Sequence, residues 1–355
     1  MTYQNILVDG IMHLGDMIMT ASVFPVLQKN CPGAKITYLA SGNLAFAAKL
    51  FDGVDEVIPY TYKSKGGYLD VYRMGRTLAR KQFDLGISLD PRERVTLMKW
   101  FAHIPERLSM EQALGWQLGW EKYFYTKDLT LPECWHYREH SMASSFQQML
   151  RLYFEDPETE FIAPRLKPLA PEIEKWAVQC LAQYGQGGKN IALCIQTTSG
   201  TKDWPPEQFA RLCDWLVEQY GATLYLTGIS THRKRADAMK RALHYPAHLV
   251  DLVGKTSFMQ LVALLRHMDA LVTLDTGTAH IGAIAGCPVV TLFSYNSPEI
   301  YKAPGKYAKC VSGHLPCSGK HICIGPNRCP KMDCVDAIHL EMVQDAVKKL
   351  LQEAR

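Results

Sequence analysis

The alternation of short apolar runs with longer helical stretches constrains the fold of this chain more than any other feature. The runs are rich in β-branched residues, and helical periodicity fills the gaps between them. This alternation is typical of parallel sheets with crossover helices. The predicted strands are residues 5–8, 35–39, 57–59, 85–88, 190–195, 222–226, 248–252, 270–274 and 288–292. The sequence therefore predicts an α/β protein with two consecutive doubly wound, Rossmann-like sheets that make a cleft between them.

The length and the proline pattern predict two domains. At 355 residues the chain is too long for one typical hydrophobic core and long enough for two domains of ordinary size. A proline-rich passage with weak periodicity, residues 157–171, is predicted to be the linker. We expect domains at 1–165 and 172–337, followed by a terminal segment at 338–355. In that segment Leu340, Val343, Val347 and Leu350 recur at helical spacing.

Composition and charge exclude several classes of protein. The hydrophobic fraction of 47% and charged fraction of 21% exclude a disordered chain. The net charge of +4 comes without a Lys/Arg-rich run, so no nucleic-acid partner is predicted. No targeting segment is visible, and the most apolar window, 270–293, carries Asp275 and His280, which makes it a poor membrane span. We expect a cytoplasmic protein that could still work at a membrane surface.

The strongest local signal is the segment 272–286, VTLDTGTAHIGAIAG. A buried strand runs into Asp275-Thr276-Gly277, and a helix starts at once. The N–H groups and the dipole of a helix N-terminus suit phosphate, Gly277 lets the backbone come close, and Thr276 and Thr278 add hydroxyls. The alternative is an ordinary strand–turn–helix capped by Thr278. His280, one turn into the helix, is by itself more often structural.

A second polar turn follows a predicted strand at residues 196–205, QTTSGTKDWP. Thr197, Thr198 and Ser199 offer hydroxyl groups, and Lys202 offers a mobile charge suited to phosphate. The alternative is a solvated loop with an incidental lysine. Both turns come at the carboxyl ends of strands, the edge where open α/β sheets bind ligands.

The first half contributes His13-Leu-Gly-Asp16, between the first strand and the first helix. Gly15 permits a tight turn, and the Asp16 carboxylate at the edge of the cleft could accept a proton from a hydroxyl. The more frequent role of such an aspartate is to stabilise a helix N-terminus. The segment is not a dinucleotide fingerprint, because G-x-G-x-x-G is absent.

Taken in order, these segments resemble the ADP-heptose:lipopolysaccharide heptosyltransferase family (glycosyltransferase family 9). The likeness rests on Gly15-Asp16 with residues 20–25, on 197–205, and on Asp275–His280 with 286–289. It implies an inverting enzyme of the GT-B fold, with an acceptor-side first domain and a nucleotide-sugar-binding second domain. The terminal helix in 338–355 would then cross back to the first domain.

The resemblance also implies roles for individual residues. Asp16 would be the catalytic base and Lys202 would contact the donor phosphates, so both are candidate catalytic residues. The implied donor-binding set is Thr197, Thr198, Ser199, Lys202, His232, Asp275, Thr276, Gly277, Thr278 and His280. Charge on the leaving diphosphate would be met by Lys202 and the helix N-terminus, and no metal is required, since no DxD motif suggests one.

The chain departs from the family pattern at His232. The family commonly has a glutamate there that contacts the nucleotide ribose, and a histidine cannot receive both ribose hydroxyls as a carboxylate does. Two alternatives therefore stay open. One is a GT-B transferase or epimerase that uses a different nucleotide-sugar, and the other is a non-catalytic nucleotide- or metal-binding scaffold.

Five of the eleven cysteines crowd into one segment near the C-terminus. Cys317, Cys323, Cys329 and Cys334, with Cys310 upstream, contain no C-x2-C pair, so common zinc-ribbon and ferredoxin spacings are not met. The segment is either a structural metal site or a set of thiols with or without a disulfide. A catalytic role for it is not expected.

The middle of the first half is locally basic. Ten cations stand there against five carboxylates. The cations are Lys63, Lys65, Arg73, Arg76, Arg80, Lys81, Arg92, Arg94, Lys99 and Arg107. Solvated helix faces explain most of them. The functional interpretation is recognition of an anionic glycolipid acceptor, the inner core of a lipopolysaccharide, with peripheral contact at the cytoplasmic face of the inner membrane.

Overall fold

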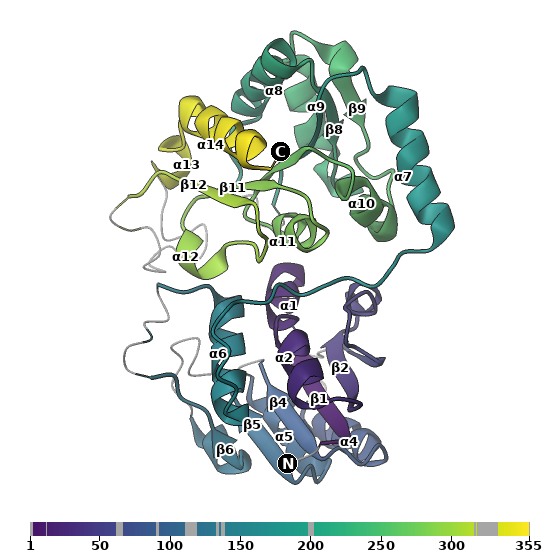
Figure 1. Ribbon diagram of the computed structural model, residues 1–355, viewed down its shortest axis with the longest axis vertical. Coiled ribbons are helices and arrows are strands. Elements are labelled where there is room, and N and C mark those ends of the chain that lie inside the picture. Colours follow the sequence, from purple (N-terminus) through teal and green to yellow (C-terminus); the bar gives the residue numbers. More distant parts are fainter. Residues whose placement is uncertain are drawn as a thin grey trace. The chain divides into compact units, whose positions relative to one another are not determined.

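The chain forms two compact units, Met1–Lys167 and Pro168–Arg355, in the computed structural model (Figure 1). The division falls inside the proline-rich passage that the sequence marks as the linker. The structure describes residues 3–11, 13–61, 67–89, 92–110, 119–132, 135, 139–197, 202–315, 317 and 333–354.

The first unit is built on a six-stranded parallel sheet with the order β3-β2-β1-β4-β5-β6. Its strands are β1 (Asn5–Gly10), β2 (Lys35–Ser41), β3 (Glu56–Tyr60), β4 (Leu85–Ser88), β5 (Glu106–Ser109) and β6 (Lys127–Asp128). Its helices are α1 (Leu14–Thr20), α2 (Val23–Asn30), α3 (Ala45–Ala48), α4 (Gly67–Ala79), α5 (Glu93–Phe101), the 3-10 helix η2 (Trp120–Phe124) and α6 (Met142–Phe154).

The second unit repeats this plan with the order β12-β11-β10-β7-β8-β9. Its strands are β7 (Asn190–Cys194), β8 (Thr223–Leu226), β9 (Leu249–Asp251), β10 (Ala270–Leu274), β11 (Val289–Phe293) and β12 (Ala308–Ser312). Its helices are α7 (Pro171–Tyr184), α8 (Pro206–Tyr220), η3 (Ser230–His232), α9 (Arg233–Arg241), η4 (Pro246–His248), α10 (Phe258–Leu265), α11 (Gly277–Ile284), α12 (Pro298–Tyr301), α13 (Asp333–Asp336) and α14 (Leu340–Glu353).

The two sheets have the same strand order when each unit is numbered from its own first strand. In both, the order reverses between the first and fourth strands, which are β1 and β4 in one unit and β7 and β10 in the other. Ligands of open α/β sheets bind at such a switch point, outside the carboxyl ends of the strands. The prediction of two Rossmann-like α/β sheets is confirmed.

The burial of the strands explains why they form a central layer. Every residue of β10 and β11 is buried, as expected of strands with helices on both faces. In the second unit these strands and the inward faces of α8 and α14 share one apolar core. The loops at the strand ends therefore rest on a rigid base, and these loops carry the candidate site.

The terminal helix α14 packs within the second unit. Its apolar stripe, Leu340, Val343, Val347 and Leu350, is buried in the core formed by β10, β11, β12 and α8. The expectation that residues 338–355 cross back to the first domain stays a prediction. Within the second unit, the apolar stripe of the helix is covered by the second sheet.

Candidate active site

A polar group at the carboxyl edge of the second sheet centres on Asp275, directly after β10. This carboxylate is nearly buried, at 8% exposure of the residue. Its Oδ2 accepts hydrogen bonds from Lys202 Nζ at 2.6 Å and from Asn296 Nδ2 at 2.6 Å. The three side chains come from the loops after β10, β7 and β11, respectively. The switch point of the sheet thus gathers residues that are far apart in the sequence.

Lys202 is held from two sides. Besides its ion pair with Asp275, its ammonium lies 5.2 Å from the centroid of the Tyr295 ring, a cation–π distance. Neither Tyr295 nor Asn296 was identified from the sequence. The available signal was the polar stretch 294–297, which follows a predicted buried strand. A lysine fixed at this edge presents a cation where a diphosphate would bind.

The helix that follows Asp275 starts as the sequence indicated. Thr276 is the N-cap of α11, and its Oγ1 accepts a hydrogen bond from the N–H of Thr278 at 3.2 Å. Gly277 is the first helical residue, so no side chain covers the start of the helix. The cap is Thr276, whereas the structural alternative expected from the sequence was Thr278. The first N–H groups of α11 and its dipole favour an anion here.

His280 lies one turn further into α11 and is buried, at 3% exposure. Its Nδ1 has no hydrogen-bond partner among the described residues. Burial lowers the pKa of the imidazole to about 4; Asp275 acts to raise this pKa and Lys202 to lower it. His280 is therefore neutral near pH 7, close enough to Lys202 and Asp275 for both charges to act on its pKa.

The loop after β7 is anchored by Asp203. The backbone N–H of Thr197 donates to Asp203 Oδ1 at 2.7 Å, and Asp203 Oδ2 lies 3.7 Å from Arg235 Nε. Arg235 also donates to the carbonyl of Ile195 at 2.9 Å, at the end of the strand. Thr197 is thus held by Asp203 just after the end of β7. The predicted residues Thr198 and Ser199 lie outside the described residues.

His232 follows β8 at the same edge of the sheet and precedes α9. Burial lowers the pKa of its imidazole, although Asp203 acts in the opposite direction. Gly228 makes room for it: a Cβ at position 228 would lie 2.8 Å from His232 Nδ1. A neutral imidazole can donate one hydrogen bond and accept one. A carboxylate, by contrast, can accept hydrogen bonds from two hydroxyl groups at once.

In the first unit, Asp16 lies in the first turn of α1, which follows β1. Its side chain is half-buried. Gly15 was predicted to form a tight turn, but α1 begins at Leu14 with His13 as its N-cap, so both Gly15 and Asp16 are helical. The position where a glycine is needed comes earlier in the chain, at Gly10, where the Tyr38 side chain lies close to the backbone. A side chain at that position would overlap the ring of Tyr38.

A buried ion pair that the sequence analysis missed lies beside this helix. Asp9, near the end of β1, pairs with Lys99 of α5, and both side chains are completely buried. Lys99 also donates to Ser88 Oγ at 2.9 Å, and the N–H of Leu89 donates to Asp9 Oδ1 at 3.0 Å. Gly86 on β4 leaves space for the stem of Lys99. The pair ties β1, β4 and α5 together at the carboxyl edge.

Only some of the cations in the locally basic middle of the first unit are therefore exposed to solvent. Lys99 is buried and neutralised by Asp9, and Arg107 donates to the carbonyls of Phe124 and Ile104. Lys81 is paired with Glu56 at 2.5 Å. The cations that reach solvent on α4 are Arg73 and Arg76. Lys63 and Lys65 lie outside the described residues.

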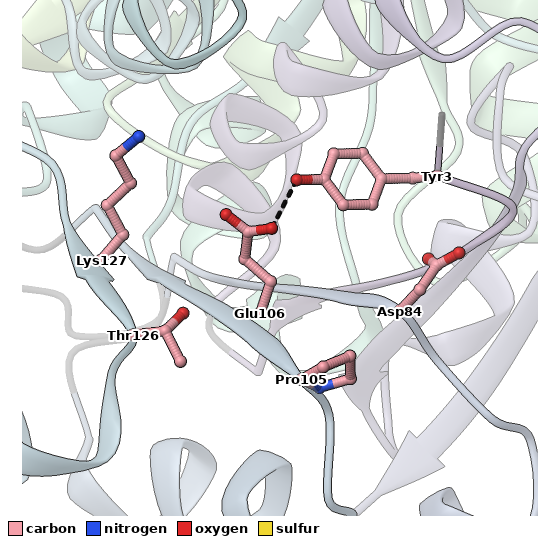
Figure 2. Close-up of a pocket in the computed structure, with 6 residues that line it drawn as sticks. All are labelled: Tyr3, Asp84, Pro105, Glu106, Thr126 and Lys127. Atoms are coloured by element: carbon pink, nitrogen blue, oxygen red, sulfur yellow. Dashed lines mark hydrogen bonds between the residues drawn. The ribbon is translucent and has the colours of Figure 1, made fainter. Parts of the chain in front are cut away.

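A pocket of about 420 Å³ lies at the opposite, amino-terminal edge of the first sheet (Figure 2). Tyr3, Asp84, Pro105, Glu106, Thr126 and Lys127 line it. Its carboxylates are already used: Glu106 accepts from Tyr3 at 2.6 Å and from Tyr153 at 2.5 Å, and Asp84 accepts from the N–H groups of Gln4 and Asn5. None of the predicted site residues lies in it. We interpret the pocket as a structural feature whose hydrogen bonds stabilise this edge of the sheet.

The cysteine segment is described only at its ends. Cys317 is half-buried, and Cys334 is buried in α13. Cys323 and Cys329 lie outside the described residues. Among the residues that the structure does describe, no group of three or more His, Cys, Asp or Glu side chains is arranged to hold a metal ion. The candidate metal site stays a prediction.

The fold is that of solved glycosyltransferase structures. A solved structure of an ADP-heptose heptosyltransferase II from Escherichia coli superposes with a TM-score of 0.76 at 21% identity, covering 99% of both chains. A family 9 glycosyltransferase from Veillonella parvula gives a TM-score of 0.82 at 23% identity, covering 99% of this chain and 98% of that one.

Sequence comparison identifies the family. The model of glycosyltransferase family 9 (heptosyltransferase) matches residues 71–323, and the chain belongs to this family. Lipopolysaccharide heptosyltransferase 2 of Escherichia coli is 24% identical over 98% of this chain and 97% of its own length. Lipooligosaccharide heptosyltransferase 2 of Haemophilus influenzae is 28% identical over 83% and 84%. None of the described helices is both long and apolar enough to cross a membrane.

Proposed function

We propose that the enzyme transfers a heptose from ADP-heptose to a hydroxyl group of a lipopolysaccharide inner core. Membership of family 9 and the names of the relatives support this donor and acceptor. The observation that carries the proposal is the 2.6 Å contact of Lys202 with Asp275 beside the start of α11. It places a cation, a carboxylate and helix N–H groups together at the switch point of the second sheet.

Each part of this group has a role in donor binding. The diphosphate binds Lys202 and the N–H group of Gly277, with the hydroxyls of Thr276 and Thr278 as further donors. Asp275 then accepts hydrogen bonds from hydroxyls of the heptose. In the free enzyme the same carboxylate pairs with Lys202, which keeps the ammonium in place and keeps a buried charge compensated.

The transfer step needs one base and a stabilised leaving group. Asp16 takes the proton of the acceptor hydroxyl as the oxygen attacks the anomeric carbon opposite the diphosphate. The bond from that carbon to the diphosphate breaks, the configuration inverts, and ADP leaves. Lys202 and the N-terminus of α11 stabilise the charge that develops on the diphosphate, so the reaction requires no divalent cation.

The acceptor is an anionic glycolipid, and the enzyme works at the cytoplasmic face of the inner membrane. The names of the relatives support the acceptor class. Arg73 and Arg76, exposed on α4, are the cations of the basic middle segment that suit contact with anionic groups.

A second candidate differs in the donor, and His232 is the observation that favours it. Its neutral imidazole accepts a single hydrogen bond and so receives only one of the two ribose hydroxyls. A GT-B enzyme for another nucleotide-sugar would have the same phosphate-binding group. Two solved UDP-N-acetylglucosamine 2-epimerases share the fold at TM-scores of 0.51 and 0.53.

Calorimetric titration with ADP, UDP and GDP tests the donor, without added metal. Selective binding of ADP is expected, and a transfer assay with ADP-heptose and lipopolysaccharide lacking heptose then measures turnover. Selective binding of UDP or GDP would replace the donor and keep the site. Failure to bind any of the three nucleotides would contradict the proposal and support a non-catalytic scaffold.

A further inference from the structure

Large aromatic side chains on the first unit stay exposed along one connected strip. We define the aromatic strip as Tyr72 on α4, Trp100 and Phe101 at the end of α5, and Trp120, Tyr123 and Phe124 on η2. The exposed fractions are 46% for Tyr72, 44% for Trp100, 48% for Trp120 and 78% for Tyr123. These are among the most exposed large hydrophobic residues described, and they come from three neighbouring elements.

Five of these rings touch in series. Tyr72 packs on Phe101 with 5.2 Å between ring centroids, and Phe101 packs on Trp100 at 4.9 Å. Trp100 packs on Phe124 at 5.2 Å, and Phe124 on Trp120 at 5.7 Å. All four contacts are edge-to-face, the geometry that aromatic pairs favour. The rings hold one another in place while their outer faces remain in water.

The core takes up only two of these rings in part, Phe101 and Phe124. The inward face of α4 is formed by Val71, Gly75 and Leu78, which are buried. A side chain at Gly75 would overlap Phe101, so the glycine lets α4 and α5 pack closely. A connected apolar surface that folding leaves exposed marks a site of interaction.

The charges around the strip are mostly positive. The side chain of Arg73 is 70% exposed, Arg76 is hydrogen-bonded to His103 at 3.2 Å, and Lys122 lies 5.2 Å from the ring centroid of Tyr123. Arg80 is also exposed at the end of α4. The carboxylate of Asp70 lies 3.8 Å from Arg73. Among the side chains that the structure describes in these segments, the exposed cations outnumber the carboxylates, so the rim is basic.

We propose that the aromatic strip docks on the surface of a bilayer that contains anionic phospholipid. Trp and Tyr rings, apolar with a polar edge, concentrate at the boundary between headgroups and acyl chains. Arginine and lysine beside them are attracted to anionic headgroups. The combination fits a lipid surface because each ring inserts shallowly while the cations stay at the level of the headgroups. This inference extends the proposed function by naming the surface that meets the membrane.

Vesicle sedimentation tests the proposal with the full-length enzyme. Vesicles of phosphatidylcholine with 30 mol% phosphatidylglycerol are compared with pure phosphatidylcholine. Trp120→Ser with Tyr123→Ser should reduce the fraction bound at least about fivefold. Arg73→Gln with Arg76→Gln should reduce it about threefold at low salt and less at high salt. The matched control is Val178→Ser with Tyr184→Ser on α7 of the second unit, where both residues are also exposed; it should bind as the unchanged enzyme does.

Several results would overturn the docking surface. These are no binding of the unchanged enzyme to the anionic vesicles, equal loss in the control, or unchanged binding of the variants. If the strip variant instead dissociated a dimer in solution, the strip would be an interface between two copies. Thermal unfolding checks that each variant folds, and the single Tyr123→Ser variant, at the most exposed ring, provides a second test.

ADP titration separates the two proposals. Loss of vesicle binding with ADP binding retained concerns the strip alone, whereas failure of the unchanged enzyme to bind ADP concerns the proposed function alone.

Discussion

Lys202 Nζ lies 2.6 Å from Asp275 Oδ2, although 73 positions separate the two residues in the sequence. The contact follows from the topology. β7 and β10 are adjacent parallel strands, with Cys194 opposite Thr273, so the loops that leave them meet at the carboxyl edge. A second pair at the amino edge of the same strands, Lys189 with Asp269, has the same 2.6 Å separation. The molecule therefore contains its own control for the role of Lys202.

Lys202→Ala is expected to lower kcat/KM for ADP-heptose about 100-fold or more, because the diphosphate loses its cation both in binding and in the transition state. Steady-state transfer assays and ADP titration measure the effect. The control is Lys189→Ala, which removes a lysine that also pairs with an aspartate, but at the opposite edge of the sheet. Its transfer rate should stay within about twofold of that of the unchanged enzyme. Equal losses in the two variants would show that Lys202 acts through stability and not through the donor.

Asp16→Asn should lower kcat about 1000-fold and leave the affinity for ADP unchanged, because the amide keeps the shape of the side chain but cannot take a proton. Turnover and calorimetric titration on the same preparation separate the two quantities. Asp70→Asn, on α4, is the control carboxylate. Transfer at the normal rate by Asp16→Asn would remove this residue from the mechanism.

Lys99→Met is expected to destabilise the first unit by about 3–5 kcal/mol, because it leaves the fully buried Asp9 carboxylate without its cation. Adding Asp9→Asn should restore a large part of that loss, since the neutral amide has no buried charge to compensate. Urea-induced unfolding of the two single variants and the double variant measures the coupling. Additive losses would indicate that the two side chains are stabilised independently.

Chelation should not affect transfer. In the proposed mechanism, Lys202 and the N-terminus of α11 supply the stabilisation that a divalent cation provides in other transferases. The rate in excess EDTA is therefore expected to stay within about twofold of the rate without it. Metal analysis of the purified protein belongs with this assay, because a metal held by the cysteine segment around Cys317 would be structural. A rate abolished by EDTA and restored by Mg²⁺ would contradict the mechanism.

Among the twelve strands that the structure describes, the sequence predicted nine and missed β5, β6 and β12. The strand–turn–helix at Asp275 was placed correctly because apolar periodicity changes there abruptly. β5 and β6 were missed because they contain charged residues and only four and two positions, respectively. The contact of Asn296 with Asp275 could not be predicted, since it depends on the strand order and on no local pattern.

The pH dependence of stability should report the burial of His280. Its pKa is lowered to about 4 in the folded enzyme, against about 6.5 in an unfolded chain. The unfolded state therefore binds the proton first, so this contribution is complete above pH 6.5 and is lost progressively between pH 6.5 and 4. At pH 5 the loss amounts to about 2 kcal/mol relative to pH 7. His280→Gln removes this titration, and the melting temperature of the variant should fall less between pH 7 and pH 5 than that of the unchanged enzyme. Equal falls in both proteins would mean that His280 is protonated as readily in the folded enzyme as in the unfolded chain.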